Sequence, residues 1–219
     1  MKMIVTLMAA AMAAGALAQV PVAAPTQKLT APWKIGGIAL GMTPAEVGLA
    51  VKEDGYKLVH RFPGRSWQGH VAHQVSISRS IKISPGPEVI RKEDYRLGDE
   101  QIQVTYMAGK AGPCVSRVDY DIAHDAIEAD HYRRVVRAKY GKPTLSWDWE
   151  SLYCSAGERQ CSRTGSLVTN QLPSLTVYVM SVSRRTLHLV QGERADRAYY
   201  AAVRAEAERL YPKTEKPNF

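Results

Sequence analysis

The sequence predicts an α+β protein with tandem helix-plus-antiparallel-sheet (αββββ) units and a C-terminal helix, the helices packing on one sheet face. One observation behind this is a short helix with marked ends at residues 44–54. Another is an internal echo, because hairpins starting Ile-Gln-Val-Thr-Tyr-Met at 102–107 and Leu-Thr-Val-Tyr-Val-Met at 175–180 each run into a helix. Strands joined by short turns must be antiparallel, so an all-parallel sheet is excluded.

The helix at 44–54 opens the first unit. Thr43 is a favourable N-cap, because its hydroxyl can accept a hydrogen bond from an N–H of the first turn. Pro44 suits the first helical position, and Glu46 completes a capping box with Thr43. Gly55 ends the helix, since glycine adopts the left-handed conformation without steric cost.

The remainder of the first unit is expected to be strands and loops. Residues 57–62 read as a strand, 63–66 as a turn, and 88–100 as a polar loop. Between them, residues 71–83 alternate apolar and polar side chains, which is typical of a strand with one buried face. The apolar positions of that alternation are Val71, Val75, Ile77, Ile81 and Ile83.

The first unit closes with a hairpin over about 102–122, and the second unit repeats its plan from residue 125. In the hairpin that starts at residue 102, Val118, Tyr120 and Ile122 share one side of the return strand, with Arg117, Asp119 and Asp121 on the other. An amphipathic helix follows at about 125–140, then a strand at 144–153. The last helix is expected over 193–211, where Pro212 ends it.

The N-terminus has the pattern of a secretory signal peptide. Lys2 supplies a positive start, residues 4–17 are apolar, and Ala16-Leu17-Ala18 resembles a small-residue cleavage site before Gln19. The apolar run is shorter than a typical transmembrane helix, so we expect cleavage and a periplasmic or secreted protein. An uncleaved anchor is the alternative interpretation.

The expected organisation follows from these boundaries. A signal peptide at 1–18 and a flexible Ala- and Pro-rich tether at 19–32 precede the first α+β unit at 33–124. The second unit, with its C-terminal helix, occupies 125–211, and residues 212–219 form a tail.

The chain is basic, with a formal net charge of +8. A basic exported protein is suited to acidic protein surfaces, anionic glycans or lipid headgroups, whereas nucleic acid is not expected as a partner outside the cytoplasm. The plainer interpretation is that most of these Lys and Arg side chains are simply solvated. No cofactor-binding motif is present, neither a phosphate-binding loop nor a dinucleotide fingerprint.

Three cysteines are compatible with an oxidising compartment. Cys154 and Cys161 flank a short polar loop, and we predict that they form a disulfide and leave Cys114 single. Three single pairings are possible, so the other two stay open as alternatives to this one. A disulfide closing so short a loop contributes about 2 kcal/mol in the chain-entropy model.

Aromatic residues supply the main candidates for a binding surface. Trp147, Trp149 and Tyr153 share strand parity, so they form either a contact patch or part of the core under the helices. The core interpretation is favoured, because one face of that strand must be buried. Trp67 and Arg65, in the loop expected after the first strand, are further binding candidates.

Histidines offer a weaker alternative of a metal-binding protein or hydrolase. His60, His70 and His73 would approach one another if the strands at 57–62 and 71–83 paired, but their spacing matches no zinc template. A second set, at one side of the helix after residue 124, departs from the HExxH metalloprotease spacing and comprises His124, Glu128 and His131. No nucleophile motif is present, since Gly64–Gly69 misses GxSxG by one residue.

The segment Ile38-Ala-Leu-Gly-Met-Thr-Pro-Ala-Glu-Val resembles the opening of many short exported bacterial proteins. It is similar to the small SmpA-type outer-membrane assembly lipoproteins and to the β-lactamase-inhibitor-protein fold, in which tandem helix-plus-four-strand units form a saddle-shaped sheet. Lys139-Tyr-Gly-Lys-Pro-Thr, which closes the second helix, is also similar to such proteins. The chain lacks the lipidated cysteine of the lipoproteins. The resemblance therefore implies a non-lipidated, non-catalytic scaffold that binds another envelope protein.

Overall fold

The computed structural model describes residues 33–123, 127–155, 161–164, 167–179 and 184–212, with the side chains of 161–170 excepted. The expected signal peptide, the tether and nearly all of the tail lie outside these residues. The elements, in chain order, are α1 (Pro44–Glu53), β1 (Lys57–Arg65), α2 (Trp67–Arg79), β2 (Glu88–Leu97), β3 (Glu100–Gly109), β4 (Gly112–Ala123), α3 (Ala129–Tyr140), β5 (Leu145–Ser146), β6 (Glu150–Cys154), β7 (Cys161–Thr164), β8 (Leu167–Asn170), β9 (Ser174–Val179), β10 (Arg184–Val190) and α4 (Glu193–Leu210).

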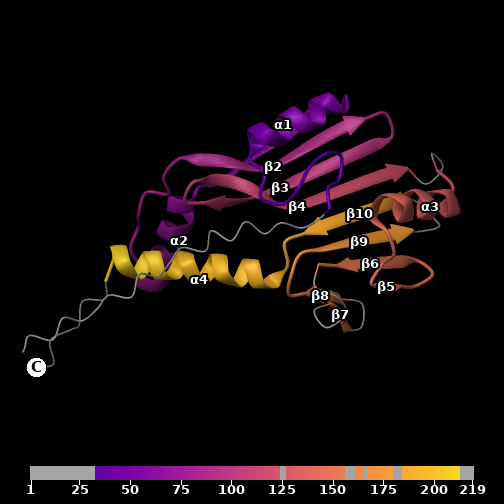
Figure 1. Cartoon of the computed structure of the whole chain (residues 1–219). Helices are drawn as coiled ribbons and strands as arrows, with labels where there is room; N and C mark the ends of the chain where they lie inside the picture. The colour runs from indigo at the N-terminus through magenta and orange to yellow at the C-terminus, as the bar shows by residue number, and fades with distance from the viewer. Residues whose placement is uncertain (1–32, 124–126, 156–160, 165–166, 180–183, 213–219) are drawn as a thin grey trace, which may run out of the picture.

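An eight-stranded antiparallel sheet organises the chain, in the order β1-β2-β3-β4-β10-β9-β6-β5, and β7 and β8 form a separate hairpin (Figure 1). The predicted α+β class with a C-terminal helix is confirmed. The two expected units meet at their last strands, because β4 pairs with β10. One continuous sheet therefore spans both halves of the chain.

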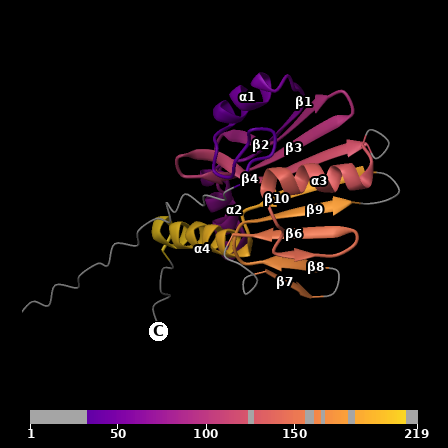
Figure 2. The same ribbon diagram turned by 45° about the vertical axis from the view of Figure 1, so that its right-hand side comes forward.

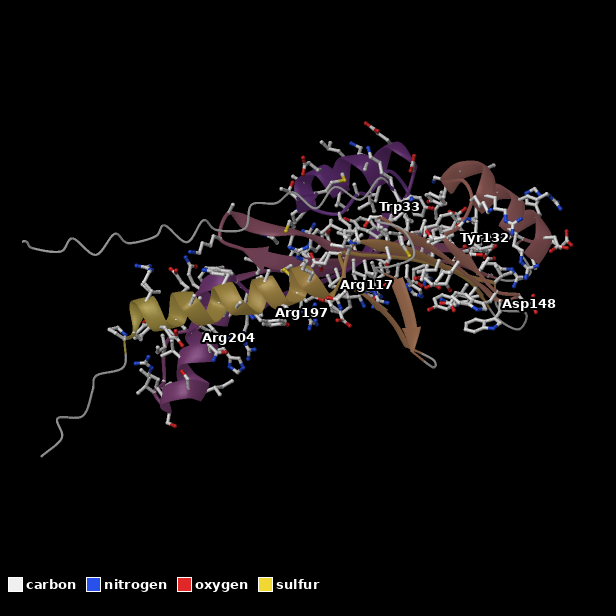
Figure 3. The ribbon with its side chains drawn as sticks, turned by 60° about the horizontal axis from the view of Figure 1, so that its bottom comes forward. Trp33, Arg117, Tyr132, Asp148, Arg197 and Arg204 are labelled. Atoms are coloured by element: carbon white, nitrogen blue, oxygen red, sulfur yellow. The ribbon has the colours of Figure 1, made fainter. Side chains whose placement is uncertain are left out.

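Helices α1 and α3 cover one face of this sheet (Figures 1 and 2). Val47 and Val51 of α1 and Tyr132 and Val136 of α3 belong to the same buried cluster as the inward side chains of β3, β4, β9 and β10. We call the covered side the core face. The segment before α1 packs there too, and Figure 3 shows Trp33 and Tyr132 on the side of the sheet opposite Arg117.

The start of α1 has the predicted chemistry. The hydroxyl of Thr43 accepts from the Glu46 backbone N–H at 3.4 Å, and the Glu46 carboxylate accepts from the Thr43 N–H at 2.7 Å. This is a complete capping box, with Pro44 at the first helical position. The helix ends at Glu53, one residue before the predicted end, and Gly55 has a φ of 84°.

The prediction of a strand at 71–83 is wrong, because Trp67–Arg79 forms helix α2. Val71 and Val75 are separated by about one helical turn, so the same two residues satisfy a helical period as well. Both pack against Val203 and Ala207 of α4 in a second, smaller core. Ile77 lies outside this core with 66% of its surface exposed. Ser66 is the N-cap of α2, because its hydroxyl accepts a hydrogen bond from the backbone N–H of Gly69.

The predictions of a turn at 63–66 and a loop at 88–100 are also wrong. Residues 63–65 belong to β1, and Glu88–Leu97 forms β2 between β1 and β3. The charged sequence of β2 resembles an exposed loop, but Glu93 is completely buried on the core face. The predicted strand at 144–153 is interrupted as well, by a turn at 147–149 between β5 and β6.

Both halves of the chain contain a β-hairpin followed by a helix, as the sequence pattern predicts. The β3–β4 hairpin precedes α3, and the β9–β10 hairpin precedes α4. The expected start of α3 at residue 125 shifts to Ala129, and residues 124–126 lie outside the described part. Helix α4 does not return over the core face but packs on α2 beyond one end of the sheet (Figure 1).

Candidate functional site: the polar face of the sheet

The sheet face opposite α1 and α3 carries a row of polar and aromatic side chains, which we call the polar face. Alternation along β4 directs Val118 and Tyr120 to the core face and leaves Asp119 and Asp121 on the other side. His188 of β10 lies directly opposite Asp119 in the strand register. The polar face therefore combines residues from both halves of the chain.

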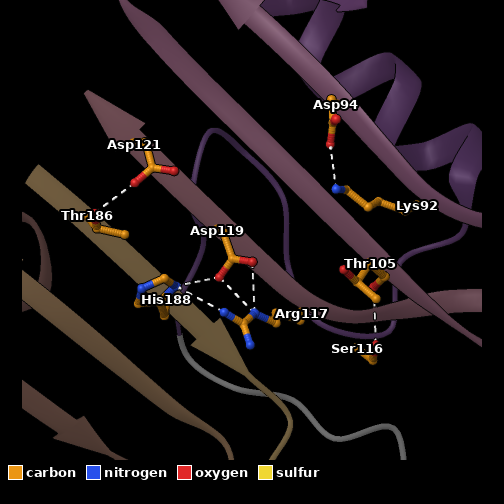
Figure 4. Close-up of polar contacts among 9 residues, drawn as sticks. All are labelled: Lys92, Asp94, Thr105, Ser116, Arg117, Asp119, Asp121, Thr186 and His188. Atoms are coloured by element: carbon orange, nitrogen blue, oxygen red, sulfur yellow. Dashed lines mark hydrogen bonds and ion pairs between the residues drawn. The ribbon is translucent and has the colours of Figure 1, made fainter. Parts of the chain in front are cut away.

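An ion-pair network occupies the centre of this face, as Figure 4 shows. The Nε of Arg117 donates to both carboxylate oxygens of Asp119 at 2.8 Å, and Nδ1 of His188 lies 2.5 Å from Asp119 Oδ1. Next along the strands, the Thr186 hydroxyl donates to Asp121 at 2.7 Å. The Asp119 side chain is 11% exposed, whereas that of Arg117 is 49% exposed. The carboxylate is thus held in place while the guanidinium still reaches solvent.

Aromatic rings extend this network towards the β6–β5 edge of the sheet. The ring of His188 meets Tyr178 of β9 edge-on, with ring centroids 5.3 Å apart. Tyr178 in turn stacks on Trp149, at 6.2 Å between centroids and 17° between ring planes. Trp149 is 44% exposed, so the row ends in an accessible indole. Such rigid aromatics bury a large area on binding at small entropic cost.

The row includes a histidine oriented by a carboxylate, which is one component of a general acid–base site. When Nδ1 of His188 donates to Asp119, Nε2 of the neutral ring is left as an acceptor. Among the described residues, no serine, threonine or cysteine side chain is hydrogen-bonded to this ring. The described part of the row therefore contains no paired nucleophile and base.

The predicted aromatic candidates are separated by the structure. Tyr153 is 3% exposed and packs in the core, so it is not a contact residue. Trp149 is exposed, which contradicts the favoured core interpretation for that residue. The backbone N–H of Trp147 donates to the Glu150 carbonyl at 2.7 Å and closes a turn, so strand parity does not apply across 147–149. Trp147 lies beside α3 and not in the row.

Trp67 and Arg65 do not belong to this row. Trp67 is the first residue of α2, and its ring meets Tyr199 of α4 edge-on at 5.6 Å, with the Lys110 ammonium over it. It therefore belongs to the α2–α4 packing and not to an exposed loop. Arg65 ends β1 and is exposed, immediately before the Ser66 cap of α2.

The weak metal candidates do not converge. His60 is on β1, whereas His70 and His73 are on α2. In the part of the chain that the structure describes, no three His, Cys, Asp or Glu side chains are placed to hold a metal ion. Burial lowers the pKa of His70 below its usual value, and the positive charge of Arg65 acts in the same direction. The second histidine set includes residue 124, which lies outside the described residues.

The cysteine prediction is tested only in part. Cys114 of β4 is free, as the predicted pairing requires, and burial raises the pKa of its thiol. Cys154 ends β6 and Cys161 begins β7, but the side chain of Cys161 lies outside the described part. The disulfide between them stays a prediction.

A buried carboxylate anchors the opposite, core face. Glu93 accepts hydrogen bonds from Arg61 Nε at 2.8 Å, from the Tyr95 hydroxyl at 2.8 Å and from the Tyr106 hydroxyl at 2.5 Å, and it forms an ion pair with Arg61 Nη2 at 2.7 Å. Burial and the bonds to Glu93 raise the pKa of both tyrosines, so these hydroxyls stay protonated and donate. All partners are structural neighbours on β1, β2 and β3. The cluster therefore stabilises the sheet and leaves no open coordination for a ligand.

None of the described helices has the length and apolar character of a membrane span. No protein-family model, curated protein or solved structure matches this chain. The resemblance of residues 38–47 to exported lipoproteins stays a prediction.

Proposed function

We propose that this chain is an exported, non-catalytic module that binds another envelope protein through the polar face of its sheet. The observation that carries the proposal is the row Trp149–Tyr178–His188–Asp119–Arg117, which joins an accessible indole to a half-exposed guanidinium. Trp, Tyr and Arg are the side chains that most often dominate binding energy at protein interfaces. The strands and the 147–149 turn position these side chains before a partner binds, which lowers the entropic cost of binding.

The test compares capture of envelope proteins by the wild-type chain and by variants of the row. Trp149→Ala removes an exposed aromatic, and Tyr200→Ala is the matched control, because Tyr200 is 56% exposed on α4 and outside the row. Mass spectrometry of proteins captured from envelope extract identifies the partner, and titration then gives each dissociation constant. We expect Trp149→Ala to weaken binding by at least about thirtyfold, as hot-spot residues do, and Tyr200→Ala to leave it unchanged.

Two results would refute the proposal. One is that no envelope protein is enriched over a control column. The other is that Trp149→Ala and Arg117→Ala bind the partner as tightly as wild type, while circular dichroism shows both variants folded.

Export has a separate test. The sequence pattern of residues 1–18 supports cleavage before Gln19, so N-terminal sequencing of protein from the producing cell should begin at Gln19. An intact Met1 on protein recovered from the cytoplasm would contradict an exported function.

A further inference from the structure

A second candidate site lies on the other side of the sheet, between α3 and the β5–β6 turn. An open depression of about 460 Å³ is found here, at the edge strand β5. Its lining residues come from α3, β5, the turn and β6, and they are Arg133, Arg137, Ser146, Trp147, Asp148 and Ser151. Figure 3 shows Asp148 at the end of the molecule where α3 lies. The depression shares none of the five residues of the polar-face row.

One of the two arginines is already used to build the site. Arg133 donates from Nη1 to the Asp130 carboxylate at 2.8 Å, and from Nη2 to the backbone carbonyl of Asp148. Its side chain is 39% exposed. Arg133 therefore ties α3 to the turn that carries Trp147, and the shape of the depression is set before any ligand enters.

The second arginine is available. Arg137 lies one helical turn beyond Arg133, is exposed, and pairs with none of the described carboxylates. A guanidinium presents parallel N–H groups that match the two oxygens of a carboxylate. With only one uncommitted guanidinium, and with Asp148 also lining the depression, the charge suits a single negative charge better than a dianion.

The rest of the lining suits a hydroxyl-bearing ring. The Ser146 and Ser151 hydroxyl oxygens are 3.1 Å apart on the paired strands β5 and β6, and each can donate or accept. The half-buried indole of Trp147 adds a flat apolar wall beside them. A few polar groups beside an aromatic surface are the usual composition of a small-ligand site.

We propose that this depression binds a sugar acid. The carboxylate pairs with Arg137, ring hydroxyls bind Ser146 and Ser151, and one face of the ring lies on Trp147. The inference does not depend on the polar face, so each proposal stands or fails without the other.

The test is a calorimetric and NMR titration of the purified full chain with D-glucuronate. D-Glucose, which has the ring without the carboxylate, and acetate, which has the carboxylate without the ring, are the comparison ligands. We expect saturable binding of glucuronate, with the Trp147 indole signal shifting, and at least about tenfold weaker binding of both comparison ligands, because each lacks one set of contacts.

Variants then locate the site. Arg137→Ala is expected to weaken glucuronate binding at least about tenfold, the usual effect of losing a charge-assisted hydrogen bond. Arg137→Lys keeps the charge without the fork and should restore only part of the affinity. Arg134→Ala is the control, since Arg134 is exposed on the same helix but does not line the depression.

Three outcomes would overturn the inference. Wild-type protein that shows no saturable binding of glucuronate refutes the site. Equal affinity for glucose and glucuronate refutes the role of the carboxylate. Equal losses in Arg134→Ala and Arg137→Ala would show that binding depends on the general positive charge of α3 and not on the depression.

Discussion

Replacing Glu93 by glutamine tests a completely buried carboxylate and the donors around it. The Glu93 side chain has no exposed surface, and its two oxygens accept three hydrogen bonds, from Arg61 Nε and from the Tyr95 and Tyr106 hydroxyls, beside an ion pair with Arg61 Nη2. Glutamine keeps the volume but has one acceptor oxygen, and its NH₂ group faces groups that also donate. At least one donor loses its partner.

The expected cost can be worked from these contacts. A buried donor left without a partner costs about 1–3 kcal/mol, and losing the charge-assisted bonds adds to this. Breaking a buried ion pair costs about 3–5 kcal/mol when the remaining charge stays buried. The Arg61 side chain is 55% exposed and can turn to water, so the lower part of that range applies. We therefore expect Glu93→Gln to reduce the free energy of unfolding by about 2–4 kcal/mol.

Urea unfolding at pH 7, followed by circular dichroism, measures this change. Glu88→Gln on the same strand is the control, because Glu88 is exposed and its loss should stay within about 0.5 kcal/mol. A double-mutant cycle of Glu93→Gln with Tyr106→Phe should show clear non-additivity, since the two groups share one hydrogen bond. A loss below about 0.5 kcal/mol for Glu93→Gln would refute the reasoning.

Three further predictions test the rest of the fold. Val75→Ala should lower the free energy of unfolding by about 2 kcal/mol, because it removes buried surface and leaves a cavity between α2 and α4. Ile77→Ala, at an exposed position of the same helix, should lower it by under about 0.5 kcal/mol. Similar losses for the two variants in urea unfolding would argue against the helix. Gly192→Ala should destabilise by more than about 1 kcal/mol, because φ is 86° and the new Cβ would lie 2.5 Å from the Leu172 carbonyl oxygen; an unchanged melting temperature would contradict this. The pKa of His70 is lowered on folding, so its contribution to stability is present above pH 6.5 and is lost as pH falls through the folded pKa. His70→Gln should flatten that part of the curve of unfolding free energy against pH, and an unchanged curve would show that His70 is not responsible.

Local chemistry in the sequence was sufficient for α1 and for the β3–β4 hairpin. The capping box at Thr43 and Glu46 involves residues three apart, and the hairpin is a short-range pairing with alternating side chains. The same alternation correctly assigned Asp119 to the face opposite the core. The contacts that decide these features lie close together in the chain, so the sequence carries their signal directly.

The secondary-structure predictions for α2 and β2 were wrong because contacts with residues far away in the sequence determine both elements. Val71 and Val75 fit both a strand and a helix, and their packing on α4, more than a hundred residues later, selects the helix. Glu93 of the charged strand β2 lies in the core, where it forms an ion pair with Arg61 of the neighbouring strand β1. Neither partner can be identified from a local window of the sequence.

The candidate sites depend on the same distinction. The sequence alone assigned Asp119 and Arg117 to the side away from the core, but it favoured a buried Trp149, which the structure shows to be exposed. Only the tertiary structure placed His188 beside Asp119, through the β4–β10 pairing, and Tyr178 beneath Trp149. Periodicity specifies which side of its own strand a residue faces, but the pairing of remote strands depends on burying the whole core face at once. That global condition brings the two halves of the polar face together.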